Sequence, residues 1–119
     1  MIDTAFANHF DPDWIDAWNS HDLDRILSHY AEDFEVSSPY IAQLAGEPSG
    51  MLKGKPAVRA YWAKALQSLP ELRFELAAVL AGVDSVVIHY RGAKGMAAEM
   101  FCFDAEGRVT GAYAHYDPC

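Results

Sequence analysis

Residues 99–116 constrain the fold more than any other segment, because their side chains alternate around a short turn. They read EMFCFDAEGRVTGAYAHY, two strand-like runs joined by a turn whose glycine suits the positive-φ position of a tight hairpin. At a period of two, Glu99 shares one face with Phe101 and Phe103, and Tyr116 lies on the matching face of the returning run. If these rings point inward, so does Glu99. A carboxyl on an apolar wall must find a partner, take up a proton or serve a ligand.

Composition bounds the class of protein. The chain has 119 residues, of which 51% are hydrophobic and 22% charged, and this is typical of a single globular domain spanning residues 1–119. A net charge of -8 makes nucleic acid or an anionic membrane an unfavourable partner. The sequence has no apolar run of membrane-spanning length and no signal-peptide pattern at its start, so we expect a cytoplasmic location.

Cysteine and histidine patterns predict neither a metal site nor a cofactor. The two cysteines, Cys102 and Cys119, form no framework or ligand pair, and the five histidines lack metal-binding spacing. Glycine-rich phosphate loops and nucleophile elbows are also missing from the sequence. We therefore expect no metal and no organic cofactor.

Helical patterns dominate the first half of the chain. Asp11 and Pro12 suit the cap and first turn of a helix, and Asp22 suits the cap of a second helix whose apolar face continues to Tyr30. The most regular helical spacing covers residues 56–69, before a proline. Three helices are expected before the main run of strands.

Strand patterns follow. Residues 34–38 predict a half-buried strand, and residues 39–54 mix glycines with scattered apolar side chains, as in a lid or rim over a pocket. A short strand or helix is equally compatible with residues 39–54. Later alternating or β-branched runs cover residues 72–76, 86–90, 96–103 and 109–116. Helices followed by antiparallel strands predict an α+β fold with helices on one face of a curved sheet.

The direction of His89 depends on one turn. A two-residue turn at positions 93–94 places Ile88 on the face of Glu99 and turns His89 outward. A three-residue turn would instead bring His89 beside Glu99 as an acid/base pair. The alternate set that contains Ile88 is the more apolar one, so we expect His89 to point outward.

Several segments carry a family resemblance: HDL at 21–23 through YAED at 30–33, the helix entry from Gly54 to Leu66, and FDAEGRV at 103–109 leading to Tyr116. Over nearly its whole length the chain resembles the nuclear transport factor two-like superfamily, which includes ketosteroid isomerases, SnoaL-like polyketide cyclases and limonene epoxide hydrolase. The resemblance implies a cone-shaped α+β barrel, with a curved, mainly antiparallel sheet around an apolar cavity. It also implies dimerisation through the outer sheet face.

The resemblance does not carry over either familiar catalytic set. Glu99 falls where ketosteroid isomerase keeps a protonated acid, but the oxyanion tyrosine of that enzyme falls on Trp14 and its general base on Ser38. An indole cannot ionise usefully, and a lone serine is no base, so steroid isomerisation by that mechanism is not expected. The last-strand aspartate of the epoxide hydrolase falls on Ala114.

Glu99 is the candidate catalytic residue. It would act as an acid with a raised pKa or as a base, and its alternative role is a buried structural carboxyl tied to neighbouring donors. The expected ligand-cavity residues are largely aromatic, and core packing is the more common role of such rings. They are Trp14, Trp18, Tyr30, Ser38, Tyr61, Trp62, Phe101 and Tyr116.

Two functions from different classes follow. The first is a cofactor-free isomerase, cyclase or hydrolase of the SnoaL-like kind, acting on a small apolar carbonyl compound or epoxide through Glu99. The second is a non-catalytic dimeric ligand-binding or scaffold domain. In both cases we expect a homodimer through the outer sheet face, where Met100, Cys102, Tyr113 and His115 point outward.

Overall fold

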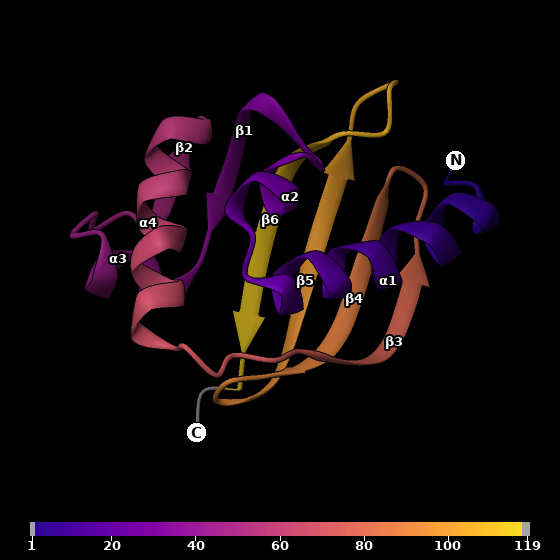
Figure 1. Ribbon diagram of the computed structural model, residues 1–119. Helices are drawn as coiled ribbons and strands as arrows, with labels where there is room; N and C mark the ends of the chain where they lie inside the picture. The colour runs from indigo at the N-terminus through magenta and orange to yellow at the C-terminus, as the bar shows by residue number, and fades with distance from the viewer. Residues whose placement is uncertain (1, 118–119) are drawn as a thin grey trace.

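Helices cover one face of a six-stranded sheet in the computed structural model, which describes residues 2–117 (Figure 1). The helices are α1 (Thr4–Ser20), α2 (Leu23–Leu27), α3 (Pro39–Leu44) and α4 (Lys55–Ser68). The strands are β1 (Tyr30–Ser37), β2 (Met51–Lys53), β3 (Glu75–Ala81), β4 (Ser85–Gly92), β5 (Gly95–Phe103) and β6 (Val109–Tyr116). This confirms the predicted α+β class.

The sheet has the strand order β2-β1-β6-β5-β4-β3. Strands β1 and β6 run parallel, and the other neighbouring pairs are antiparallel. The sheet does not close on itself, because β2 and β3 remain as its two edges. The predicted cone is therefore an open, curved sheet whose concave side faces α1 and α4 (Figure 1).

Helix α1 begins earlier than predicted. Its cap is Asp3, whose side chain accepts a hydrogen bond of 2.8 Å from the backbone N–H of Ala5, so the predicted start at Asp11 and Pro12 is wrong. Pro12 lies inside the helix, and Asp11 is buried within it. The ring of Phe6 makes an edge contact with Phe103, with 4.9 Å between the ring centroids. Packing of this kind stabilises the additional helical turns that precede Asp11.

The second helix is shorter than predicted, and the first strand is longer. Asp22 caps α2 as expected, accepting bonds from the N–H groups of Asp24 and Arg25. The helix ends at Leu27, however, and Tyr30 is the first residue of β1 instead of part of a helical face. The segment 39–54, left open between loop, strand and helix, contains both α3 and β2, so the structure describes four helices instead of three.

The strand predicted at residues 72–76 is displaced toward the C-terminus. Leu72 and Phe74 lie in the connection before β3, and Leu76 is 43% exposed on the edge strand. Leu72 and Phe74 pack against the core from this irregular segment, and their spacing of two residues therefore resembles that of a strand. The remaining strands, β4, β5 and β6, cover the predicted runs.

The turn between β4 and β5 is the two-residue form. Gly92 pairs with Gly95 and Ile88 with Glu99, so His89 is exposed on the outer face, as expected. Gly107 has a φ of +80° in the following turn, the conformation that favours glycine. The register of the whole hairpin therefore points Glu99 toward the helices.

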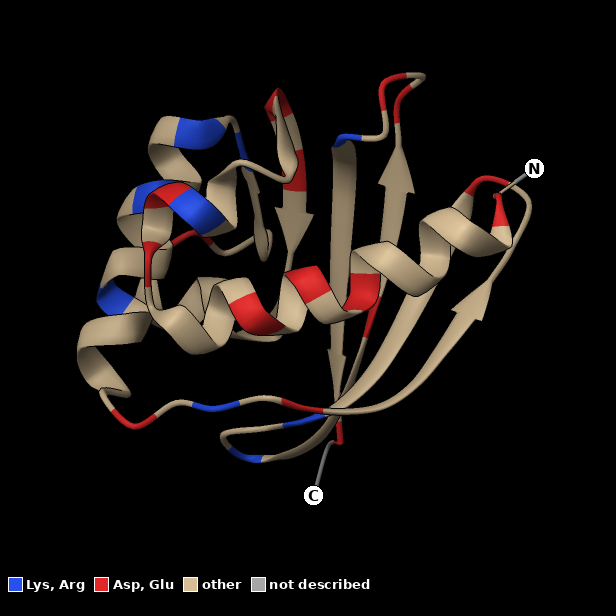
Figure 2. Cartoon of the chain, turned by 45° about the vertical axis from the view of Figure 1, so that its right-hand side comes forward, with Lys and Arg blue, Asp and Glu red and all other residues tan. Residues whose placement is uncertain are grey.

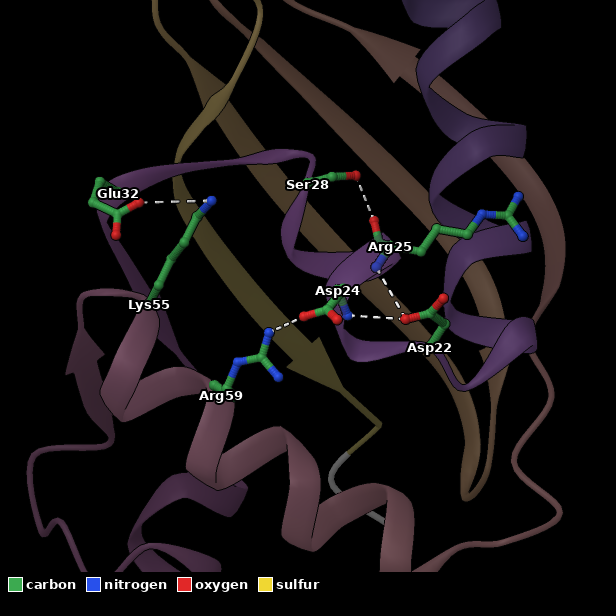
Figure 3. A network of polar contacts seen from close by, with 7 residues as sticks. All are labelled: Asp22, Asp24, Arg25, Ser28, Glu32, Lys55 and Arg59. Carbon is green, nitrogen blue, oxygen red and sulfur yellow. Dashed lines mark hydrogen bonds and ion pairs between the residues drawn. The ribbon is translucent and has the colours of Figure 1, made fainter.

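Ion pairs connect α2 and β1 to α4 (Figure 3). Arg59 of α4 binds the carboxylate of Asp24 in α2, and Lys55 lies 3.8 Å from the carboxylate of Glu32 in β1. Exposed pairs like these contribute little free energy, on the order of 0–1 kcal/mol each. Helix α4, which they connect to α2 and β1, also carries the buried side chains of Tyr61 and Trp62.

Charge is unevenly distributed. Acidic residues recur along α1, whereas basic residues gather on α4 and α2 (Figure 2). Within the described residues, no helix combines the length and apolar character needed to cross a membrane.

Candidate functional site

A pocket of about 170 Å³ lies between the inner sheet face, α1, α3 and α4. Small side chains on the sheet make room for it, because Ala114 lies directly opposite Glu99 and leaves space above the carboxyl. Its wall is mostly aromatic and aliphatic. The lining includes Trp14, Trp18, Ser38, Tyr40, Tyr61, Trp62, Tyr90, Lys94, Glu99, Ala114, Tyr116 and Asp117.

Glu99 lies in this wall, at the middle of the inner sheet face. It is 6% exposed and is flanked by Ile88 on β4 and Ala114 on β6. The hydroxyl of Tyr90 donates a hydrogen bond of 3.2 Å to its Oε1 atom. The predicted inward direction of Glu99 is therefore confirmed, while its role stays a prediction.

Burial raises the pKa of Glu99 from 4.5 to about 7. The low-dielectric surroundings disfavour the charged carboxylate, and the hydrogen bond from Tyr90 opposes this effect without cancelling it. Near neutral pH the group is therefore divided between a carboxylic acid, which can donate a proton, and a carboxylate, which can accept one.

Tyrosine hydroxyls surround the carboxyl. Burial raises the pKa of Tyr30, Tyr90 and Tyr116, and the negative charge of Glu99 raises each of them further. Burial also raises the pKa of Tyr61, against an opposing hydrogen bond with Ser38. These phenols stay protonated near neutral pH, so they can donate hydrogen bonds but cannot act as bases.

Trp14 and Ser38 make hydrogen bonds of structural character. The indole Nε1–H of Trp14 donates to the hydroxyl of Tyr30 at 2.9 Å, and both rings are buried. The Oγ of Ser38 accepts from the backbone N–H of Tyr40 at 3.2 Å and caps α3. Trp14 and Ser38, which occupy the positions of the isomerase tyrosine and general base, thus form hydrogen bonds that stabilise the fold.

Six of the eight residues expected around a cavity line this pocket: Trp14, Trp18, Ser38, Tyr61, Trp62 and Tyr116. The other two, Tyr30 and Phe101, lie behind the wall and are 1% and 0% exposed. Phe101 is covered by the rings of Phe10 and Trp14, which contact it edge-on at 5.1 and 5.2 Å. Both therefore belong to the core beneath the pocket.

Five of the lining residues named above were not among the predicted site residues: Tyr40, Tyr90, Lys94, Ala114 and Asp117. The alternation that turns His89 outward also places Tyr90 on the inner face with Ile88, but it gave no sign that the Tyr90 hydroxyl binds Glu99. Tyr40 and Lys94 had no such signal, because they reach the pocket from α3 and from the β4–β5 turn.

The mouth of the pocket is framed by contacts between distant segments. The ring of Tyr40 lies 4.7 Å from that of Tyr116, measured between centroids, and Nζ of Lys94 lies 4.8 Å from the centre of the Tyr40 ring. Helix α3 thus forms part of the rim, which fits the lid or rim expected in residues 39–54.

Among residues 2–117, no group of three or more His, Cys, Asp or Glu side chains lies together in a way that could hold a metal ion. Cys102 is a free thiol, half-buried on the sheet, and Cys119 lies outside the described residues.

Comparisons with known proteins identify relatives of this architecture. A SnoaL-like protein of unknown function from Burkholderia thailandensis has 62% sequence identity and a TM-score of 0.94, over 98% of each chain. The epoxide hydrolase/cyclase-like enzyme SalBIII, of pyran ring formation in the polyether salinomycin, has 17% identity and a TM-score of 0.77, over 99% of this chain and 95% of its own.

A third solved structure, TerC co-crystallised with polyporic acid, has 16% identity and a TM-score of 0.75, over 94% of this chain and 91% of its own. Likeness at such low identity shows a common fold alone. Among curated proteins the sequence has no significant match.

The family model for the SnoaL-like domain matches residues 12–113, which include both sides of the pocket and the whole Glu99 strand. With 62% identity to a SnoaL-like protein over nearly its full length, this chain belongs to the SnoaL-like domain family.

Proposed function

We propose that this protein binds a small apolar carbonyl compound or epoxide in the pocket and that Glu99 exchanges a proton with it, without a cofactor. One observation carries this proposal: a buried carboxyl, with a pKa of about 7, lines an aromatic pocket. A proton-transfer group is most effective when its pKa lies near the working pH.

The protonated form of Glu99 would serve as a general acid. It would donate its proton to the oxygen of a bound carbonyl or epoxide as negative charge develops there. Phenol hydroxyls of Tyr61 and Tyr116, which line the same pocket and stay neutral, are available as further hydrogen-bond donors. The apolar wall would exclude water and strengthen each of these interactions.

An epoxide would be opened by protonation of its oxygen together with attack on one of its ring carbons. The carbon–oxygen bond breaks as the oxygen takes the proton of Glu99, and a water or a hydroxyl of the same substrate bonds to the carbon. The proton lost by that nucleophile returns to the Glu99 carboxylate. Water would give a hydrolase and an internal hydroxyl a cyclase. For a carbonyl compound, the carboxylate form would take a proton from the adjacent carbon and return it elsewhere, as in an isomerase.

The size of the pocket favours a small ligand. Pockets for drug-sized ligands measure roughly 300–1,000 Å³, and this one is about 170 Å³. The fold shared with an epoxide hydrolase/cyclase-like enzyme supports ring-opening or ring-closing chemistry as the first class to test.

A second candidate is a non-catalytic ligand-binding or scaffold domain. The hydrogen bond from Tyr90 to Glu99 favours it, because a buried carboxyl with a fixed donor can be a structural group. The hydrogen bonds that Trp14 and Ser38 form with Tyr30 and Tyr40 also favour this non-catalytic candidate.

A thermal-shift screen of small ketones and epoxides, on wild type and Glu99→Gln at pH 7, tests the proposal. A ligand that binds the folded state raises the melting temperature, and we expect the hits to raise it more in wild type. Incubation of those hits, followed by NMR, should then show conversion that Glu99→Gln slows by about 10²–10⁴-fold. Glu71→Gln, which removes an exposed carboxyl outside the pocket lining, is the matched control.

The outcomes separate the two candidates. Hits without conversion would support the binding domain. Hits that stabilise both proteins equally would exclude Glu99 as a recognition group and overturn the proposed chemistry.

A further inference from the structure

Lys94 places a positive charge at the mouth of the pocket. It occupies the exposed two-residue turn between β4 and β5, and it lines the pocket although the turn itself is on the surface. Its ammonium lies 4.8 Å from the centre of the Tyr40 ring, a position in which the ring face attracts a cation. None of the ion pairs among the described residues includes Lys94.

The inner wall of the pocket has a different character. Glu99 and the tyrosine hydroxyls face the interior, and the phenols stay neutral. The carboxyl of Asp117 also lines the mouth, and this residue is not without an interaction partner. The pocket therefore presents hydrogen-bond donors inside, and at its entrance the ammonium of Lys94 lies on the same rim as the carboxyl of Asp117.

We propose that the ligand is an apolar carbonyl compound or epoxide that also bears a carboxylate, which Lys94 binds at the mouth while Glu99 faces the neutral oxygen inside. This inference rests on the proposed function, and it names the substrate class of the same pocket.

Several features of the mouth select an anion. A charge-assisted bond to an ammonium is stronger than one between neutral groups, and at the rim the carboxylate keeps part of its hydration. The contact with Tyr40 holds the ammonium near its working position, so less side-chain freedom is lost on binding. Lys94 would repel a cationic ligand, and a wholly neutral ligand would form no charge-assisted bond with it.

Two ketones of matched shape test the inference. 4-Acetylbenzoate and 4-methylacetophenone share the ring and the ketone and differ in a carboxylate or a methyl group. Their dissociation constants would be measured by calorimetry at pH 7, on wild type, Lys94→Met and Lys94→Arg. Lys64→Met serves as the control, because it removes the same charge from an exposed position of α4 outside the pocket lining.

We expect wild type to bind 4-acetylbenzoate about tenfold more tightly than 4-methylacetophenone. Lys94→Met should abolish this difference, whereas Lys94→Arg and Lys64→Met should retain it. The affinity for 4-methylacetophenone should be the same in all four proteins. Melting curves of each variant would verify that it is folded.

Two results would overturn the inference. If the carboxylate brings no advantage in wild type, or if Lys94→Met weakens both ketones alike, the mouth does not select an anion. A fifth protein, Glu99→Gln, would be measured in the same way, and the proposed function would survive that result provided that 4-methylacetophenone binds wild type more tightly than Glu99→Gln. If neither ketone binds wild type, the proposed function fails for carbonyl compounds, and the inference fails with it.

Discussion

Tyr90 and Glu99 are joined by a hydrogen bond of 3.2 Å between neighbouring strands, and among residues 2–117 this bond is the interaction that lowers the pKa of the carboxyl. A phenol O–H favours the charged form of its acceptor, whereas burial favours the neutral form. The acidity of the pocket thus depends on a balance between these two residues.

Tyr90→Phe should raise the pKa of Glu99 further above about 7, because it removes the donor and keeps the apolar ring. An increase of up to about one pH unit is expected. Titration of the Glu99 side-chain carboxyl by ¹³C NMR measures this directly. Tyr61→Phe is a suitable control, because its hydroxyl does not donate to Glu99. A lowered value in Tyr90→Phe would show that the bond stabilises the acid form instead.

The contribution of Glu99 to stability should fall as pH rises from 4.5 to about 7. The pKa of Glu99 is raised in the fold, from 4.5 to about 7, so folding favours the protonated carboxyl. Its contribution is complete below pH 4.5 and is lost as pH rises through 7, a change of about 3 kcal/mol in the free energy of unfolding.

Glu99→Gln removes this titration and keeps the side-chain shape. Urea denaturation at pH 5 and pH 8 should show that the variant gains relative to wild type as pH rises. At pH 8 we expect the variant to be the more stable protein. A difference between the two proteins that stays constant across this range would contradict a raised pKa for Glu99.

Phe101→Ala should destabilise the protein strongly, by about 3–5 kcal/mol, because the ring is fully buried beneath Trp14 and Phe10. Urea midpoints measure the loss. Leu44→Ala is the contrasting variant, since Leu44 is 39% exposed and its truncation should cost far less. Similar losses in the two variants would argue against the core described above.

We also propose that two copies of the chain associate through the outer sheet face. A row of side chains crosses four strands there, because Leu80 pairs with Val87, Val87 with Met100, and Met100 with Tyr113. Leu80 is 62% exposed and Met100 36%, so apolar surface is available for a partner.

Met100→Lys should therefore shift the protein toward monomer in sedimentation velocity at micromolar concentration. Ala60→Lys adds the same charge to exposed α4 and should leave association unchanged. A wild-type monomer at these concentrations would count against the interface.

Local patterns predicted much of the sheet. The alternation in residues 99–116 and the glycine of its turn predicted β5, β6 and the direction of Glu99, because both depend on neighbours in the chain. The alternation left the register of β4 open between a two-residue and a three-residue turn, and the more apolar face of Ile88 favoured the two-residue turn that the structure has. A strand pattern with one buried face specifies its register strongly, so these predictions needed no distant contact.

Tertiary contacts decided what local patterns could not predict. Helix α1 extends back to Thr4 because Phe6 and Phe10 pack on rings of β5, although Asp11 and Pro12 look like a helix start. The mouth of the pocket could not be predicted either. Tyr40, Lys94 and Tyr116 converge there from segments that are far apart in the chain.

The parallel pairing of β1 with β6 has a consequence for how the chain reaches this state. Val36 pairs with Ala112, so a strand formed early in synthesis acquires its long neighbour only when the last strand is available. Until then β1 has only the three residues of β2 beside it. Contacts between such distant segments slow folding, so a nascent chain that stops at residue 108 should expose the edge of β1 to chaperones or to aggregation.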